Sequence, residues 1–267
     1  MMSAEIYLQT INWQKRLRRE IPILKEICEQ KNTTQKQIRI LDLGCGPGKH
    51  LTELAKYFPK AELVGIDLSS EMIQLAQKLL ISFDWAISSQ INFHAGDFFS
   101  QSPSNFGKFD FIYSLGNSIL LMLEDHKPLE LFSRINQFLA PNGLLFFQIL
   151  NNSKPRKGYV PSPICHTQEG DNFYTIKRFD PNLHQNQMEV EFVEVYQKKN
   201  RSKPEVKAHK SFWPLISNSE IAKILSSFNL EILETWGSYN KIPFSSSKHD
   251  SLLLLAQKRN KNSNFLY

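Results

Sequence analysis

The stretch Leu41-Asp42-Leu43-Gly44-Cys45-Gly46-Pro47-Gly48 decides the fold of this chain. An apolar run over residues 38–43 predicts a strand. It enters a loop with glycine at every second position, and a helical pattern follows from Lys49. Glycine lets the backbone turn sharply and lie close to a ligand, and the start of the following helix offers N–H groups to that ligand.

A carboxylate stands at the end of the next predicted strand. Asp67 follows the apolar run Leu63-Val64-Gly65-Ile66, nineteen residues after Gly48. A carboxylate at this distance can accept hydrogen bonds from the two hydroxyls of a ribose. The glycine loop and Asp67 together predict a ligand that contains a nucleoside.

Asp42 and the glycine spacing narrow the class of nucleoside. Gly44, Gly46 and Gly48 form a GxGxG pattern, whereas the dinucleotide fingerprint is GxGxxG. A dinucleotide would place its diphosphate beside the loop, where Asp42 would repel it. A ligand with a positive centre meets no such repulsion. These residues resemble the first motif of the class I S-adenosylmethionine-dependent methyltransferases, whose cofactor carries a sulfonium and an ammonium.

Strands and helices alternate along the chain. Strands are expected at residues 38–43, 62–66, 91–94, 109–114, 144–150, 230–236 and 252–256, and helices at 49–57, 70–81, 126–139 and 218–228. Such alternation gives a doubly wound sheet with right-handed crossovers. The expected fold is α/β: a Rossmann-like, seven-stranded, mostly parallel sheet with helices on both faces, plus an antiparallel β insertion after the fifth strand.

Changes in composition divide the chain into four parts. Residues 1–36 are expected to hold a cover helix (residues 11–29, with Pro22 as a kink or break) and a linker. The cofactor-binding core is expected over residues 37–150 and its C-terminal part over residues 214–267. Between them, residues 151–213 are expected to form an antiparallel cap over the substrate, because a Pro-, Ser- and Gly-rich stretch precedes three strand-like runs.

Composition excludes several classes of protein. A hydrophobic content of 41% over 267 residues supports a real core, and no run approaches the ~18 apolar residues of a membrane span. The net charge of +6 is spread in small groups with acids nearby, which favours solvated faces over a nucleic-acid stripe. Three scattered cysteines predict neither a disulfide framework nor a zinc site. We therefore expect a reduced, cytoplasmic protein with no metal and no membrane partner.

The methyltransferase resemblance implies further cofactor contacts after each strand. Gly96-Asp97-Phe98 stands where the family places an acid on the adenine amino group and an apolar side chain on the ring, and Leu68 and Met72 stand near the ribose and adenine. The N-terminal helix resembles a cover helix whose Arg16 meets the cofactor carboxylate. The implied cofactor set is Trp13, Arg16, Asp42, Gly44, Gly46, Gly48, Asp67, Leu68, Met72, Gly96, Asp97, Phe98, Ser114, Leu115 and Gly116.

The loop after the fourth strand bears on the acceptor. Residues 114–118 read Ser-Leu-Gly-Asn-Ser, which is similar to the corresponding loop of glycine and sarcosine N-methyltransferases and related small-molecule enzymes. The Asp/Asn/Ser-Pro-Pro-aromatic tetrapeptide of enzymes that methylate exocyclic amines of bases does not stand there, which disfavours a nucleic-acid substrate. Candidates for the acceptor pocket are Asn117, Arg178 (as an anchor for a carboxylate), Tyr196, Trp213 and Tyr239, with Tyr174 as a further aromatic.

These observations predict an S-adenosyl-L-methionine-dependent methyltransferase that acts on a small molecule, at an amine nitrogen, by in-line transfer. An oxygen acceptor would require a base, for which His126 and His166 are the candidates. The alternatives are an RNA or protein methyltransferase and a non-catalytic S-adenosylmethionine-binding protein. The sequence leaves the acceptor, the catalytic residues, the pathway and a homo-oligomeric state open.

Overall fold

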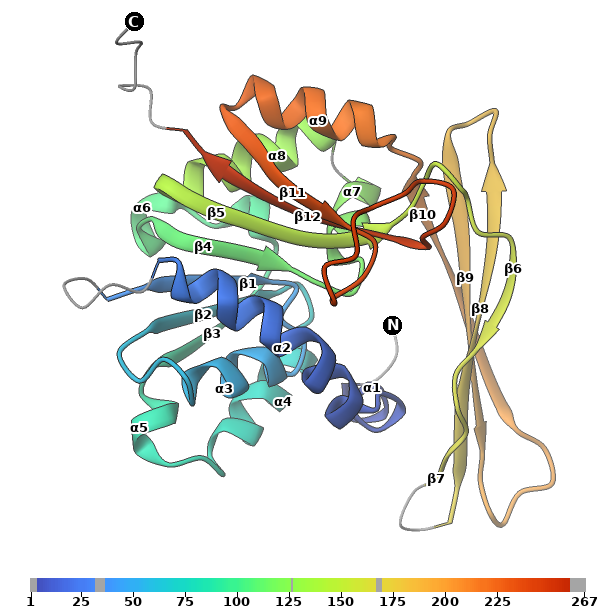
Figure 1. Ribbon diagram of the computed structural model, residues 1–267. Helices are drawn as coiled ribbons and strands as arrows, with labels where there is room; N and C mark the ends of the chain where they lie inside the picture. Colours follow the sequence, from blue (N-terminus) through green and yellow to red (C-terminus); the bar gives the residue numbers. More distant parts are fainter. Residues whose placement is uncertain (1–3, 32–36, 126, 167–169, 260–267) are drawn as a thin grey trace, which may run out of the picture.

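The computed structural model describes residues 4–31, 37–125, 127–166 and 170–259. Two β-sheets organise the described chain (Figure 1). A seven-stranded sheet forms the centre of the core, and a smaller antiparallel sheet stands beside it as a cap. The expected α/β architecture is confirmed, including the insertion after the fifth strand.

The large sheet has the strand order β11-β12-β5-β4-β1-β2-β3. Six strands run in the same direction, and β12 runs antiparallel to both of its neighbours. The strands are β1 (Arg39–Leu43), β2 (Glu62–Asp67), β3 (Ile91–Ala95), β4 (Phe109–Ser114), β5 (Leu139–Leu150), β11 (Leu230–Trp236) and β12 (Ser251–Lys258). Since side chains alternate along each strand, the sheet presents two apolar faces that must both be covered.

Helices cover both faces of this sheet (Figure 1). One core cluster joins the sheet to α2 (Trp13–Glu29), α3 (Lys49–Ala55) and α4 (Ser70–Leu80). The other joins it to α7 (Ser118–Asp125), α8 (Pro128–Phe138) and α9 (Asn218–Ser227). The shorter helices are α1 (Ala4–Thr10), α5 (Trp85–Ser88), η1 (Phe98–Ser100) and α6 (Pro103–Phe106). None of the helices in the described part combines the length and apolar character that a bilayer crossing requires.

The N-terminal part differs from its prediction. The helix expected over residues 11–29 is present as α2, which starts at Trp13 because the side chain of Asn12 accepts a hydrogen bond from the N–H of Lys15 (2.9 Å), and a further helix, α1, precedes it. Pro22 lies inside a continuous α2 and does not break it. Its missing hydrogen bond is offset by burial of neighbouring apolar side chains such as Ile21, Ile23 and Leu24.

Two further boundaries differ. The helix α7 was not expected, and the helix expected from residue 126 begins at Pro128 in α8, while His126 lies outside the described residues. The fifth strand begins at Leu139 rather than at residue 144, and Asn142 adopts a positive φ of 60° within it. A local irregularity in the pairing of β4 with β5 accommodates this residue. Most of the linker expected up to residue 36 also lies outside the described residues.

The cap sheet is an insertion between β5 and α9. Its strands are β6 (Gly158–Pro161), β7 (Cys165–His166), β8 (Asn172–Asn182), β9 (Gln187–Gln197) and β10 (Glu205–Pro214). The two ends of the insertion are fastened together, since Nδ2 of Asn152 donates to the carbonyls of Pro214 and Ile216 (3.3 and 3.2 Å). One end of the cap packs on α7, where Oγ of Ser211 donates to Glu124 (2.5 Å).

Helix α1 connects the core to the other end of the cap. Ala4 packs against Met72 and Leu75 of α4, and the Cys165 thiol donates to the carbonyl of Gln9 (3.3 Å). The carboxyl ends of the parallel strands point toward the cap, and α1 lies between α4 and the cap (Figure 1). The predicted cofactor residues gather at this edge.

Candidate active site

The glycine loop is built for close approach at one position in particular. Gly44, Gly46 and Gly48 all have positive φ angles (76°, 53° and 69°), which favour glycine. A Cβ on Gly48 would lie 2.2 Å from Cζ of Phe93, and one on Gly44 would lie 2.5 Å from Oγ of Ser118, so protein atoms fill both places. Around Gly46 the nearest atom would be 3.9 Å away. Gly46 is therefore the glycine of the three that leaves room for a ligand.

Asp67 ties the glycine loop to the next helix. Its Oδ2 accepts the N–H of Gly46 (2.8 Å), and its Oδ1 accepts the N–H of Ser69 (2.9 Å), the residue that caps α4. Burial raises the pKa of Asp67, and the two N–H groups oppose that rise. Each carboxylate oxygen retains a lone pair beyond these bonds. The arrangement fits a ribose whose two hydroxyls donate to Asp67.

Asp42 is a buried carboxylate with an unsatisfied oxygen. It is 3% exposed, and neither its Oδ2 nor the neighbouring Tyr113 hydroxyl has a hydrogen-bond partner of normal geometry in the described chain. Burial raises the pKa of Asp42 to about 7, and the nearby Tyr113 hydroxyl and the charge of Arg16 oppose this rise. A positive ligand group near Asp42 would stabilise its ionised form, which fits a sulfonium or ammonium cofactor.

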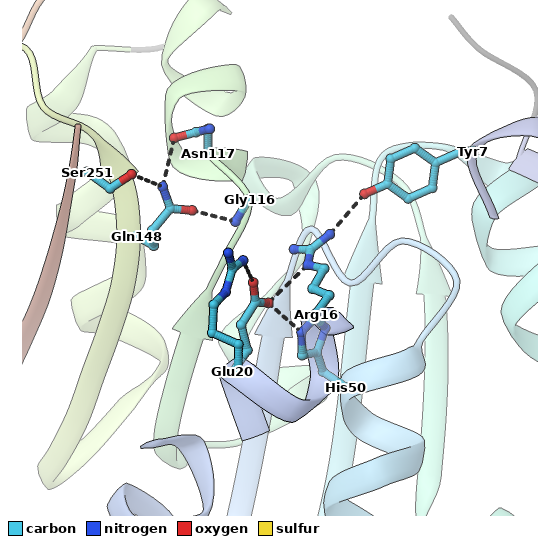
Figure 2. Close-up of polar contacts among 9 residues, drawn as sticks. Tyr7, Arg16, Glu20, His50, Gly116, Asn117, Gln148 and Ser251 are labelled. Atoms are coloured by element: carbon cyan, nitrogen blue, oxygen red, sulfur yellow. Dashed lines mark hydrogen bonds and ion pairs between the residues drawn. The ribbon is translucent and has the colours of Figure 1, made fainter. Parts of the chain in front are cut away.

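Arg16 is held by a buried polar network (Figure 2). Its Nε donates to Oε2 of Glu20 (3.0 Å) and its Nη1 to the hydroxyl of Tyr7 (3.3 Å). Oε2 of Glu20 also contacts Nε2 of His50 (2.8 Å), and Oε1 accepts from Arg19 (2.5 Å). The side chain of Arg16 is thus fixed by groups from α1, α2 and α3.

The charges in this network shift the pKa values of its members. Burial alone would raise the pKa of Glu20, but the hydrogen bond from His50 and the charge of Arg16 lower it to about 2. Burial lowers the pKa of His50, with Glu20 opposing that effect and Arg16 adding to it. Burial also acts to lower the pKa of Arg16, yet Tyr7 and Glu20 raise it overall. Glu20 and Arg16 are therefore an ionised buried pair.

The loop after β4 is held by Gln148 of β5 (Figure 2). Oε1 of Gln148 accepts the N–H of Gly116 (3.0 Å), while Nε2 donates to Oδ1 of Asn117 (3.2 Å) and to Oγ of Ser251 (3.3 Å). Nη2 of Arg16 stands 3.0 Å from the place of a Cβ on Gly116. Since Oδ1 of Asn117 is engaged, its Nδ2 remains as the donor that this side chain can present.

Several other predicted cofactor residues have side chains committed to the fold. Oγ of Ser114 donates to the carbonyl of Leu43 (2.8 Å), and Leu115 is buried in the core. Nε1 of Trp13 donates to the carbonyl of Leu8 (3.0 Å), and its ring lies 5.2 Å from the Arg16 guanidinium. These contacts place the backbone of the loop and the side chain of Arg16 rather than reach a ligand.

The adenine end is only partly as expected. Oδ1 of Asp97 accepts the N–H of Phe99 (3.0 Å) and caps η1, and the N–H of Gly96 donates to the carbonyl of Asp67 (2.9 Å), so Gly96 lies beside the ribose acid. Phe98 is 3% exposed and its ring packs on Phe138 in the core, which does not support the expected contact with adenine.

Leu68 and Met72 have contrasting surroundings. Leu68 is 65% exposed beside Asp67. Met72, in contrast, packs against Ala4 of α1. Of the two, Leu68 is the side chain left open to the nucleoside.

The acceptor candidates divide into two groups. Tyr239 lies by the Arg16 network, with the Arg19 guanidinium 4.9 Å from its ring, and Asn117 lies on the exit loop. Trp213 is 4% exposed and donates to Oγ of Ser211 (2.8 Å) within the core packing, and the Tyr196 hydroxyl donates to Asp171 (2.5 Å).

Arg178 does not have the surroundings of a carboxylate anchor. It lies on the outer face of the cap and pairs with Asp180, Glu189 and Glu191 (2.9, 2.6 and 2.9 Å). Tyr174 shares that outer face by strand alternation. The exposed His166 contacts Asn172 (2.7 Å) at the cap edge.

Some residues of the site carry no sequence motif. Glu20, His50, Tyr7 and Gln148 were not predicted. The sequence holds a signal for two of these four residues. Glu20 stands four residues after Arg16, the spacing of a helical ion pair, and Gln148 is the polar residue in the apolar run of β5. His50 and Tyr7 carry no such signal, since only the fold brings them to Arg16.

Comparison with known proteins agrees with this geometry. Residues 40–143 match the model of a family described as "Methyltransferase domain". A trans-aconitate 2-methyltransferase of Variovorax paradoxus is 35% identical over 114 residues, which are 43% of this chain and 39% of that protein. A malonyl-(acyl-carrier protein) O-methyltransferase of Halalkalibacterium halodurans is 28% identical over 146 residues, 54% of this chain and 51% of that protein. The chain thus spans about half the length, or less, of these relatives.

Solved structures resemble the whole fold. An S-adenosylmethionine-dependent methyltransferase from Clostridium acetobutylicum superposes with a TM-score of 0.69 at 17% identity, covering 94% of this chain and 93% of that one. The amino pentose methyltransferase CalS10 of Micromonospora echinaspora, solved with its cofactor bound, gives 0.66 at 16% identity and 97% of each chain.

Residues 40–143 thus match a methyltransferase domain, and the described chain has the fold of solved S-adenosylmethionine-dependent methyltransferases. The surroundings of Asp42, Gly46 and Asp67 fit the cofactor for which these solved structures are named, S-adenosyl-L-methionine.

Proposed function

We propose that the chain transfers the methyl group of S-adenosylmethionine to a small-molecule acceptor, at an amine nitrogen. The observation that carries the proposal is the contact of Arg16 with the backbone of Gly116. This contact lies at the edge of the sheet that also holds Asp67, and the cap sheet stands beside that edge. A cofactor held there has its ribose at Asp67 and its carboxylate at Arg16. Its sulfonium lies between them, near the exit loop.

The chain's own contribution is orientation. S-adenosylmethionine, when bound, supplies a methyl carbon activated by its positively charged sulfur. Asp67 and Arg16 hold the two ends of the cofactor, while Gln148 fixes the exit loop that faces the methyl group. Holding reactants in line can supply up to about 7–11 kcal/mol of the barrier reduction. Such catalysis places few demands on a protein base when the acceptor is a neutral amine.

Neutral groups at the exit loop favour an amine over an oxygen acceptor. The side-chain hydrogen bonds of this loop in the described structure come from the amides of Asn117 and Gln148 and from the Ser118 hydroxyl, which donates to the carbonyl of Leu115, and the charged group beside it, Arg16, is a cation that cannot act as a base. An alcohol or phenol would need a base to remove its proton, whereas an unprotonated amine attacks directly. The similar proteins include a trans-aconitate 2-methyltransferase, whose acceptor is an acid, and CalS10, whose acceptor is an amino pentose.

The position of the cap favours a small molecule as the methyl acceptor. It covers the carboxyl edge of the sheet and is fastened at one end to α7 and at the other to α1. An acceptor must fit between this cover and the glycine loop, which suits a small molecule better than a nucleic-acid or protein chain.

The test uses cofactor with a radiolabelled methyl group. The protein is incubated with a cell lysate, and label is followed into small-molecule, RNA and protein fractions. We expect label in the small-molecule fraction, in products that resist mild alkali, since N-methyl groups survive conditions that hydrolyse methyl esters. The Asp67→Ala variant should lose the transfer, while Asp84→Ala, an exposed acid on α5's edge, should retain it. Label in RNA or protein alone, or no transfer, would contradict the proposal.

A further inference from the structure

The inner face of the cap carries polar groups in its middle that the cofactor site does not use. Strand register pairs Thr175 with Glu194 and Lys177 with Phe192, so these four side chains share one face of the sheet. Phe179, two residues beyond Lys177 on the same face, packs into the core of the large domain. The face that holds Lys177 and Glu194 is therefore the one turned toward the core.

Glu194 is a buried carboxylate with one oxygen that lacks a hydrogen-bond donor in the described structure. It is 7% exposed, and its Oε1 has no hydrogen-bond partner in the described part of the chain. Burying a carboxylate without hydrogen bonds is costly, and unpaired buried polar atoms are rare in native proteins. A ligand group that donates a hydrogen bond to Glu194 would satisfy this oxygen.

Lys177 is the matching cation without a carboxylate. No ion pair to it is found among the described residues, and its ammonium lies 5.3 Å from the centroid of the Phe192 ring. Burial lowers the pKa of Lys177, and the nearby charge of Arg16 lowers it further. On the adjacent position, facing outward, Arg178 is paired with three acids. The outward-facing Arg178 is thus fully paired, whereas the inward-facing Lys177 has no carboxylate partner among the described residues.

An aromatic pair lies beside these two charges, since Phe192 is directly opposite Lys177 and two residues from Glu194. The ring of His209 stacks on that of Phe192, with centroids 4.8 Å apart and planes 3° from parallel. His209 lies directly opposite Phe192 in the register of β9 with β10. Glu194 and Lys177 occupy diagonal positions beside this pair, which places their Cα atoms roughly 7–8 Å apart.

We propose that Lys177 and Glu194 recognise the methyl acceptor: an anionic group of the acceptor binds at Lys177, and an ammonium or hydroxyl group donates to Glu194. This inference rests on the proposed function. Because the two side chains are separated along the sheet, the two groups of the acceptor stand several bonds apart rather than on one carbon. The methyl acceptor is therefore a polar molecule that carries an anionic group at one end and a hydrogen-bond donor at the other.

Four matched probes test the pair on protein saturated with S-adenosylhomocysteine, the cofactor product. They are γ-aminobutyrate, 3-aminopropylphosphonate, butylamine (which has no anion) and butyrate (which has no donor). Calorimetry should show both amino acids binding about tenfold more tightly than butylamine or butyrate, since each charged hydrogen bond contributes on that scale. The ratio between carboxylate and phosphonate identifies which anion Lys177 prefers.

Variants of Lys177 and Glu194 test which end of the probe each residue binds. Lys177→Gln should reduce γ-aminobutyrate affinity to that of butylamine, and Glu194→Gln should reduce it to that of butyrate. The controls are Lys210→Gln, which removes a cation from the outer face, and Glu205→Gln, which removes an exposed acid from the end of β10. Both should bind the probes as the unaltered protein does.

The outcomes are separable from those of the proposed function. Equal affinity for γ-aminobutyrate and butylamine would overturn the role of Lys177, and equal affinity for γ-aminobutyrate and butyrate would overturn that of Glu194. Absence of probe binding by protein that still binds S-adenosylhomocysteine would overturn both. Failure to bind S-adenosylhomocysteine would instead contradict the proposed function.

Discussion

The guanidinium of Arg16 rests against the backbone of Gly116: its Nη2 is 3.0 Å from the place that a Cβ on Gly116 would occupy. Arg16 comes from the N-terminal helix α2 and Gly116 from the exit of β4, so one contact joins two segments a hundred residues apart. It brings the expected carboxylate-binding cation to the loop expected to face the methyl group.

Gly116→Ala should weaken both folding and cofactor binding. The φ of 69° at Gly116 costs an alanine about 1–2 kcal/mol, and the added methyl group displaces Arg16. Chemical denaturation should show that loss, and calorimetry should show weaker S-adenosylhomocysteine binding. Gly158→Ala is the control, because Gly158 also has a positive φ (110°) but has no atom near its Cβ position. Equal affinities of the two variants would contradict the role given to the contact.

Asp67→Asn should weaken S-adenosylhomocysteine binding by about 1.5–3 kcal/mol, because it removes a charged acceptor of hydrogen bonds. The variant also loses one acceptor for the N–H groups of Gly46 and Ser69, so its melting temperature should fall. Asp84→Asn changes an exposed acid and should leave the affinity unaltered. An unchanged affinity in Asp67→Asn, measured by calorimetry, would refute the ribose assignment.

Glu20→Gln should destabilise the protein at neutral pH by ~3 kcal/mol, since it leaves Arg16 buried without its ionised partner. The pKa of Glu20 falls from 4.5 to about 2 on folding. Its ionised form therefore contributes stability above pH 4.5, and this contribution is lost as the pH falls toward 2. The difference between variant and unaltered protein, followed by urea denaturation, should shrink over that interval. Glu29→Gln, at the exposed end of α2, should show little change at any pH. A constant difference would argue against the pairing.

Asp42 should make cofactor binding depend on pH. Burial raises its pKa from 3.8 to about 7, so its neutral form stabilises the folded protein at low pH and this contribution is lost as the pH rises through 7. The sulfonium of S-adenosylmethionine favours the ionised form, so binding below pH 7 releases a proton. Affinity should therefore rise from pH 6 to 7 and level off above it.

The slope in pH should be smaller for S-adenosylhomocysteine, which has no sulfonium, and absent in Asp42→Asn. Calorimetry in buffers of different ionisation enthalpy would report the released proton directly. The same slope in Asp42→Asn as in the unaltered protein would exclude Asp42 as its source.

Local patterns of the sequence were sufficient for the large sheet. The strands at 109–114 and 230–236 were predicted to the residue, because apolar runs bounded by polar residues mark strands of a doubly wound sheet. The GxGxG loop and Asp67 likewise specify their own neighbourhood, since the ends of adjacent parallel strands must meet at one edge. Predictions of this kind succeed because they depend on residues that are close together in the sequence.

Other features depend on which face a residue occupies. Arg178 seemed suited to bind a carboxylate, yet one step along β8 turns it outward and turns Lys177 inward. Phe98 follows Asp97 as the family pattern requires, but the turn of η1 directs its ring into the core. The Glu20–His50 contact joins residues thirty apart in sequence, and no periodicity predicts it.

The bridging amide of Asn152 has a consequence for how such a protein diversifies. It brings the entry and exit of residues 153–213 to one point on the large domain, so the cap begins and ends at the same place. A chimaera that grafts the corresponding segment of another methyltransferase between Asn152 and Pro214 would keep the glycine loop, Asp67 and Arg16 in place. Under the proposed role of Lys177 and Glu194, such an exchange would change the acceptor while the cofactor-binding residues stay constant.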